Sequence, residues 1–254
     1  MRAIARSRKT GTALLLAALT AACVSPQARL AAQQEKDPQY QYEKAAVCVQ
    51  AGLPDEAIKY LNRAVLLDPN HYLAYNLFGL VYMLKRDFPN AAATLEKCIA
   101  LKPDFSEAHN NLGTVLQETG QTAKAEAEFK RAFEIDQSYN ASYNLAKINF
   151  ERGQLEPALS YVGQSLQKYD RSLLAWNLQG LILDTMERTD EAIASYQQGL
   201  KRVPNEENVS FNLAVAYFRK GDKGRAKEIL DRILKTTKNE NLRARVLALL
   251  DKLK

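Results

Sequence analysis

Residues 72–103 read YLAYNLFGLVYMLKRDFPNAAATLEKCIALKP, and the rest of the chain repeats their pattern. If a repeating unit begins at Tyr72, small residues stand at position 8, which is Gly79, and at position 20, which is Ala91. Small residues at a crossing let two helices approach closely, and Pro103 at position 32 cannot continue a helix. The stretch therefore predicts two antiparallel helices that cross through small residues.

Both small positions recur along the chain. Position 20 recurs at steps of 34, 34, 33, 34 and 34 residues, as Ala57, Ala91, Ala125, Ala158, Ala192 and Ala226. Position 8 recurs with it as Ala45, Gly79, Gly113, Ala146, Gly180 and Ala214. Units of fixed length bury their apolar faces on their neighbours. These positions predict six helix pairs over residues 38–238, and we assign the short step to the loop around residues 137–140.

The spacing resembles the tetratricopeptide repeat, a pair of helices in 34 residues. Larger residues stand at positions 4, 11, 24 and 27 of the quoted stretch, as Tyr75, Tyr82, Leu95 and Cys98. Trp176 takes position 4 of the fifth unit. The resemblance implies an all-α fold, a right-handed superhelical solenoid of about six tetratricopeptide helix pairs. It implies less about function, because the same scaffold serves many roles.

Turn and end residues support the helix boundaries. Glycine stands at position 15, just past the first helix, in four units as Gly52, Gly120, Gly153 and Gly221. Glycine there is typical of a helix C-terminus. After the sixth unit, residues 239–254 carry an apolar helical stripe, made of Leu242, Val246, Leu249, Leu250 and Leu253. A solenoid needs a polar outer end, so we predict a capping helix. The alternative is a helix on a membrane surface, which the basic excess near this end favours.

The amino terminus predicts export. Residues 1–10 carry four basic groups and no acid, and a short apolar run follows from Gly11 to Ala22. This run is too short to span a bilayer, so residues 1–22 are typical of a signal peptide. The sequence Leu19-Thr20-Ala21-Ala22-Cys23 resembles the bacterial lipobox, which implies lipidation of Cys23. The alternative is an ordinary secretory signal in which Cys23 has no role.

Residues 23–37 are polar and show no apolar helical stripe, so we predict a lipidated, flexible tether. The residue after the cysteine is Val24 rather than aspartate. In Gram-negative lipoproteins, this implies a place in the cell envelope, on the outer membrane facing the periplasm. Cys48 and Cys98 fall at apolar core positions, so buried free thiols are favoured over a disulfide.

Composition and motifs argue against several classes of function. The net charge of +6 falls to 6 − 4 = +2 without the four basic residues of the signal peptide, so nucleic acid is not an expected partner. The chain has no glycine-rich phosphate loop, nucleophile elbow or cysteine–histidine metal motif. We therefore expect no enzyme activity, no cofactor, no metal and no small-molecule substrate.

Function is then expected on the concave surface, which in this family is lined by positions 2, 5, 9 and 12 of each first helix. We predict a peptide-binding groove formed by Asn76, Asn110, Tyr143, Lys147, Asn177 and Phe211. Carboxamides can pair with the backbone of an extended client, and aromatic rings supply apolar contact area. The alternative is that the asparagines only hold neighbouring helices together.

The architecture of lipobox, short tether and six repeats resembles the pilotin lipoproteins of type IV pilus biogenesis. The resemblance implies a membrane-anchored protein–protein interaction scaffold that escorts or assembles an outer-membrane client such as a secretin. Its partners would be that protein client, held as an extended segment, and the membrane through the lipid. The other interpretation is a periplasmic adaptor lipoprotein that recruits peptidoglycan hydrolases or proteases.

Overall fold

The computed structural model describes residues 25–253, and the chain is helical in this range with no strand. The predicted all-α fold is therefore confirmed. The predicted signal peptide and Cys23 lie outside the described residues. None of the helices between residues 25 and 253 has both the length and the apolar character needed to cross a membrane.

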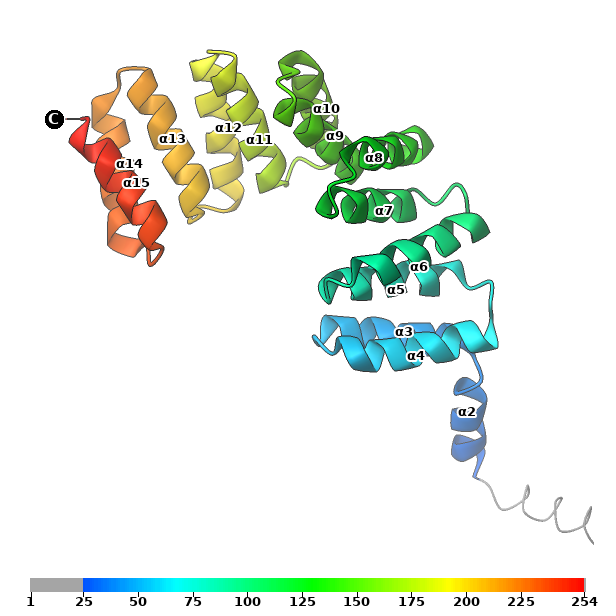
Figure 1. The fold of residues 1–254 in the computed structure, drawn as a ribbon. Helices are drawn as coiled ribbons and strands as arrows, with labels where there is room; N and C mark the ends of the chain where they lie inside the picture. Colours follow the sequence, from blue (N-terminus) through cyan, green and yellow to red (C-terminus); the bar gives the residue numbers. More distant parts are fainter. Residues whose placement is uncertain (1–24, 254) are drawn as a thin grey trace, which may run out of the picture. The chain divides into compact units, whose positions relative to one another are not determined.

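Twelve of the helices form the six predicted pairs (Figure 1). Their bounds are α3 Pro38–Gln50, α4 Pro54–Leu67, α5 Tyr72–Leu84, α6 Phe88–Leu101, α7 Ser106–Glu118, α8 Thr122–Asp136, α9 Tyr139–Glu151, α10 Leu155–Lys168, α11 Leu173–Thr185, α12 Thr189–Arg202, α13 Glu207–Arg219 and α14 Lys223–Thr236. A short helix, α2 (Pro26–Gln34), precedes them, and α15 (Glu240–Asp251) follows. We call the first helix of each pair helix A and the second helix B.

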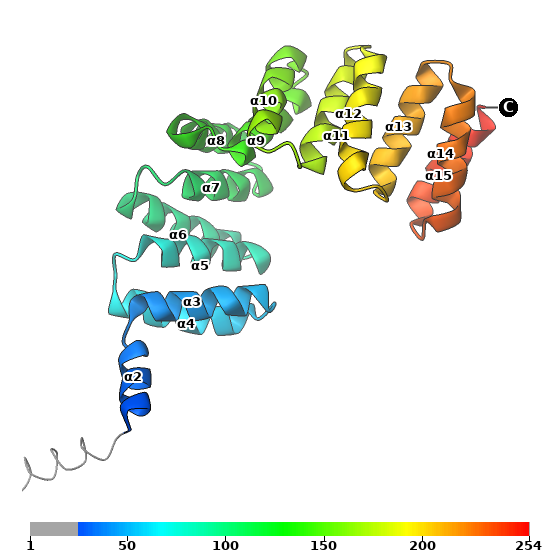
Figure 2. The ribbon, with the colours of Figure 1, turned by 180° about the vertical axis from the view of Figure 1, so that it is seen from behind.

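The described residues divide into two compact units, 25–103 and 104–253. The first unit contains α2 to α6, and the second contains α7 to α15. Within each unit, the two helices of a pair pack on each other, and helix B packs on helix A of the next pair. Figures 1 and 2 show this order in α11, α12, α13 and α14, which lie side by side.

Glycine at position 8 makes room for a large side chain of helix B. A Cβ atom on Gly113 would lie 2.6 Å from Cε1 of Phe129, and one on Gly79 would lie 2.5 Å from Cγ of Leu95. Both contacts are too close for a real Cβ atom, so these crossings need glycine. The sequence alone suggested that Gly79 lies against the small residue Ala91. In the structure the space beside Gly79 is filled by Leu95, the large residue at position 24.

Left-handed backbone ends helix A in all six pairs. The four glycines at position 15 have φ angles between 71° and 85°. Arg86 and Glu187 occupy the same position in the second and fifth pairs, with φ angles of 57° and 61°. An L-residue with a Cβ atom is strained in this region, so these two pairs end their first helix at an energetic cost.

The short step of the repeat lies where it was predicted. Helix α8 has 15 residues and ends at Asp136, and only Gln137 and Ser138 separate it from α9. Four residues, 68–71, separate α4 from α5. A loop shorter by two residues and a helix longer by one together account for the step of 33. Gln137 then reverses the chain with a φ angle of 52°.

Helix α15 closes the carboxyl-terminal end. Leu242, Val246 and Leu249 are buried against a cluster that includes Phe211 and Leu230. The apolar stripe therefore faces the protein, which confirms a capping helix instead of a membrane-surface helix. Counted from the first residue of α15, Leu247 takes the place that Ala214 takes in α13, and its side chain is 50% exposed. A leucine there would obstruct a helix B packed as in the earlier pairs.

In the amino-terminal part the structure differs from one prediction and agrees with another. The expectation of a flexible tether is wrong for residues 26–34, which form α2. Glu35, just after α2, accepts hydrogen bonds from Gln41 Nε2 at 2.9 Å and from Lys44 Nζ at 2.8 Å. These bonds attach the end of α2 to the first pair. The preference for free thiols is confirmed, with Cys98 buried and Cys48 half-buried.

Candidate protein-binding surface

The predicted site residues of the second unit stand on neighbouring helices A. Helices α7, α9, α11 and α13 each contribute positions 5, 9 and 12. Helix α11 contacts both α9 and α13. Positions 9 and 12 are three residues apart, so they lie on the same face of each helix.

The carboxamides at position 5 bond to helix A of the next pair. Asn110 Oδ1 accepts a hydrogen bond from Asn144 Nδ2 at 3.0 Å. The same bond joins α11 and α13, where Asn177 Oδ1 accepts a hydrogen bond from Asn212 Nδ2, also at 3.0 Å. Asn144 and Asn212 both stand at position 6. These bonds hold neighbouring helices A together, and a groove role for Asn110 and Asn177 stays a prediction.

The other four predicted groove residues differ in accessibility. Asn76 and Phe211 are 5% and 7% exposed, so their side chains belong to the packing and are not open to a client. Phe211 is further covered by the Arg245 guanidinium of α15, which lies 4.3 Å from the ring centroid. Tyr143 and Lys147 are half-buried on α9, and burial raises the pKa of the Tyr143 hydroxyl. Asn76 belongs to the first unit, and the other five belong to the second.

A row of half-buried apolar side chains runs over three helices A. It consists of Phe150 on α9, Leu181 on α11, and Val215 and Phe218 on α13. Leu174, at position 2 of α11, is 63% exposed and lies on the same helix face as Leu181. We call these five residues the apolar row. Partly exposed apolar side chains gathered on one surface are typical of a protein-binding site.

A charged pair lies within the apolar row, because Asp184 takes on α11 the position that Phe150 and Phe218 take on α9 and α13. Arg219 donates a hydrogen bond to Oδ2 of Asp184, which stands at position 12 of α11. The Asp184 side chain is only 10% exposed, and its Oδ1 atom receives no hydrogen bond from residues 25–253. Burial raises the pKa of the nearby Tyr196 hydroxyl, and the Asp184 carboxylate raises it further. Arg219 therefore compensates a charge that water reaches poorly.

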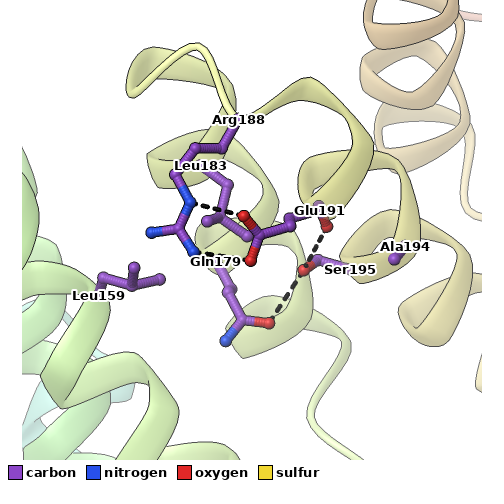
Figure 3. Close-up of a pocket in the computed structure, with 7 residues that line it drawn as sticks. All are labelled: Leu159, Gln179, Leu183, Arg188, Glu191, Ala194 and Ser195. Atoms are coloured by element: carbon purple, nitrogen blue, oxygen red, sulfur yellow. Dashed lines mark hydrogen bonds and ion pairs between the residues drawn. The ribbon is translucent and has the colours of Figure 1, made fainter.

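A polar pocket of about 360 Å³ lies between α10, α11 and α12 (Figure 3). Arg188 binds Glu191 through two hydrogen bonds of 2.6 Å, which lower the pKa of the Glu191 carboxyl. Ser195 Oγ donates to Gln179 Oε1 at 2.9 Å. An amide oxygen is not a general base, so this contact does not activate the hydroxyl as a nucleophile. The pocket is built from groups that satisfy one another.

Sequence reasoning missed two of these features. Leu174 stands at position 2, one of the four positions expected to line the concave surface, but the predicted groove residues stand at positions 5 and 9 alone. The pocket could have been found from the sequence, because Gln179 and Ser195 are polar at positions 7 and 23, where the next pair has the apolar Leu213 and Ile229. Among residues 25–253, no group of His, Cys, Asp and Glu side chains is arranged to hold a metal.

Comparison with known families agrees with the repeat spacing. Models of the tetratricopeptide repeat match residues 42–104, 94–127 and 185–253, which together make up more than half of the chain. The chain is a tetratricopeptide repeat protein. This tetratricopeptide repeat protein is 27% identical over 159 residues to anaphase-promoting complex subunit 3 of Schizosaccharomyces pombe, and the match covers 62% of the chain. The chain spans 24% of the length of that protein, and less than two thirds of the length of the other curated relatives it matches.

Two solved structures resemble the tetratricopeptide repeat protein over nearly their full lengths. Pseudomonas aeruginosa pilF matches with a TM-score of 0.76 and 14% identity, over 85% of this chain and 99% of pilF. PilW, described as a widely conserved type IV pilus biogenesis factor, matches with a TM-score of 0.74 and 18% identity, over 83% of this chain and 98% of PilW. At these identities the likeness shows the fold alone.

Proposed function

We propose that the protein is a lipid-anchored scaffold of the bacterial outer membrane that holds a protein client on the apolar row. The observation that carries the binding role is the row itself, with Leu174 63% exposed at its edge. A client that covers such side chains removes apolar surface from water, which is the main driving force of association. Tetratricopeptide repeat proteins mediate protein–protein interactions, and this surface fits that role.

The client that we propose is a secretin of a type IV pilus. The lipobox ending at Cys23 supports a membrane anchor, and the folds of pilF and PilW cover nearly the same span of repeats. The row offers apolar side chains from three neighbouring helices, and the charge of Asp184 within it is compensated by Arg219, which suits an apolar segment of a protein that later inserts into a membrane. This proposal differs from the adaptor alternative in the client it predicts.

The site is tested with Leu174→Glu in the full-length protein. A charged residue on an exposed apolar position should disturb binding and leave folding intact, because exposed substitutions usually change stability by less than about 0.5 kcal/mol. The matched control is Leu247→Glu, since Leu247 is 50% exposed in the same unit but lies on α15. We expect Leu174→Glu to lose co-purification with the secretin of the same cells and Leu247→Glu to keep it.

The anchor is tested separately with Cys23→Ser. We expect this variant to leave the outer-membrane fraction and to lose labelled palmitate, with the repeat region still folded. Equal labelling of the variant and the wild type would contradict lipidation at Cys23. If the wild type co-purifies with peptidoglycan hydrolases instead of a secretin, the adaptor role replaces the pilus role. If Leu174→Glu then loses those hydrolases, the apolar row is still the binding site.

A further inference from the structure

The amino-terminal end of the first pair exposes a surface that every later pair buries. Val47 on α3 is 64% exposed, although Val81, at the same position 10 of the next pair, is fully buried. Tyr40 is partly exposed at position 3, where the next pair has the buried Ala74. The open surface includes a shallow cavity of about 360 Å³ lined by Tyr40, Glu43, Lys44, Val47, Cys48 and Tyr60. We call these six residues the end face.

The two ends of the repeat array differ. The carboxyl-terminal end is closed by α15, whose exposed Leu247 blocks a further helix. A head-to-tail contact between copies would need that end as the complement of the end face. Self-association through the end face must therefore use the same surface on both copies, which is an isologous contact with two-fold symmetry.

The charges on α3 are self-complementary in one orientation. Tyr40 and Val47 are seven residues apart, so they lie along one line of the helix, with Glu43 and Lys44 on opposite sides of that line. A two-fold axis parallel to α3 places Val47 opposite Val47 and Glu43 opposite Lys44 of the other copy. With α3 helices antiparallel, Glu43 would face Glu43, and like charges would repel.

The side chains of the end face are arranged for this contact. Lys44 Nζ lies 4.7 Å from the centroid of the Tyr40 ring and 5.3 Å from that of Tyr60, and Glu35 holds it at 2.8 Å. The Lys44 ammonium group is therefore held beside the line of Tyr40 and Val47. It has three N–H donors, so it can donate another hydrogen bond to an incoming carboxylate. Within the described residues Glu43 makes no ion pair, and its carboxylate accepts a hydrogen bond from Gln39 at 3.0 Å.

We propose that two copies of this chain associate through their end faces, around a two-fold axis parallel to α3. Tyr40 and Val47 meet their counterparts at the axis, and Glu43 of each copy pairs with Lys44 of the other. The parallel arrangement sends both amino termini out of the same end of the dimer. Two anchored chains then reach one membrane surface without reversing either chain.

The first test is disulfide cross-linking of the full-length protein in mild detergent. Val47→Cys is made in a Cys48→Ser background, so that the neighbouring thiol takes no part. The matched control is Leu84→Cys in the same background, because Leu84 is 67% exposed in the same unit but lies outside the end face. We expect a covalent dimer on a non-reducing gel for Val47→Cys and little or none for Leu84→Cys.

The second test measures association by sedimentation velocity. Val47→Glu should abolish the dimer, and Leu84→Glu should leave it unchanged. Glu43→Lys replaces two attractive pairs with two repulsive ones, so we expect the dimer dissociation constant to rise by about 5- to 30-fold. Circular dichroism confirms that each variant is folded, which is expected because Val47 and Glu43 are exposed.

Two results would overturn the proposal. One is a wild-type protein that is monomeric at every concentration, with equal cross-linking of Val47→Cys and Leu84→Cys. The other is cross-linking that requires Tyr40→Cys in one copy and Val47→Cys in the other, because that pairing belongs to antiparallel helices.

Discussion

At the scale of single residues, the strained turns after helix A are the clearest feature. Six turns use the same left-handed position, four with glycine and two with Arg86 and Glu187. A residue with a Cβ atom costs about 1–2 kcal/mol in that region, although glycine also loses more entropy on folding. Glu187 therefore marks a position where the natural residue is not the most stable one.

We predict that Glu187→Gly stabilises the second unit by about 0.5–1 kcal/mol, because glycine removes the strain of the φ angle of 61°. The measurement is the midpoint of urea unfolding. The reverse change, Gly120→Ala, should lower stability by about 1 kcal/mol, because its φ angle is 78° and no neighbour lies within 4 Å to add a clash. A lower midpoint for Glu187→Gly would show that the glutamate side chain stabilises the folded state by more than its backbone strain destabilises it.

At the scale of helices, two contacts determine how each pair is built and how pairs are joined. Inside a pair, a small residue at position 8 faces a large one at position 24. Glycine is used with Leu95, Phe129 and Tyr196, and alanine with Leu61, Val162 and Leu230. Between pairs of the second unit, asparagines at positions 5 and 6 bond across neighbouring helices A.

The pair of α7 and α8 offers a compensation test. Gly113→Ala places a methyl group against Phe129, and overpacking of this kind costs about 1–3 kcal/mol. Adding Phe129→Leu creates the combination that Ala45 and Leu61 already use. We therefore expect the double variant to be more stable than the sum of the two single changes predicts, as measured by a double-mutant cycle in urea. Strict additivity would mean that residues 113 and 129 do not share the contact.

The bond between Asn177 and Asn212 is predicted to contribute to stability and not to client affinity. Asn177→Ala leaves the Asn212 amide without its acceptor, so stability should fall by about 0.5–1.5 kcal/mol. The double variant with Asn212→Ala should show a coupling energy of about the same size. Thermal unfolding and client affinity are measured on the same proteins, and a loss of affinity at unchanged stability would restore the groove role of Asn177.

At the scale of the whole molecule, the repeat array needs its end covered because each pair is stable only against a neighbour. Helix α15 covers Phe211, Ala214, Leu230 and Ile233, which are all buried. The first unit and the second unit each have their own buried clusters. Loss of the cap should therefore affect the second unit first.

We predict that truncation after Lys238 lowers the thermal midpoint of the second unit and increases binding of a hydrophobic dye. The reason is that Leu230 and Ile233, now 0% and 3% exposed, would lose the side chains that cover them. The control is Leu247→Ala, which should change stability by less than about 0.5 kcal/mol because Leu247 faces solvent. An unaltered midpoint after truncation would mean that α15 does not cap the array.

The sequence alone determined the fold, because the constraint is local and repeats. Small residues at positions 8 and 20 recur with one register, and the glycines at position 15 end helix A where a Cβ atom is disfavoured. The short loop at Gln137 and the apolar stripe of α15 could be located in the same way. Residues 26–34 could not, because nine residues with one leucine give no clear helical pattern.

Only the tertiary structure decided which surface residues are free. Asn110 and Asn177 stand at a position that could face a client, but the acceptor of each is used by the position-6 asparagine of the next pair. Phe211 resembles an exposed aromatic in the repeat pattern, and it is buried because the cap places Arg245 over its ring. Val47 and Val81 share residue type and register, yet one is 64% exposed and the other is fully buried. The physical reason is that burial depends on the neighbouring pair, and a repeat pattern is the same whether or not that neighbour exists.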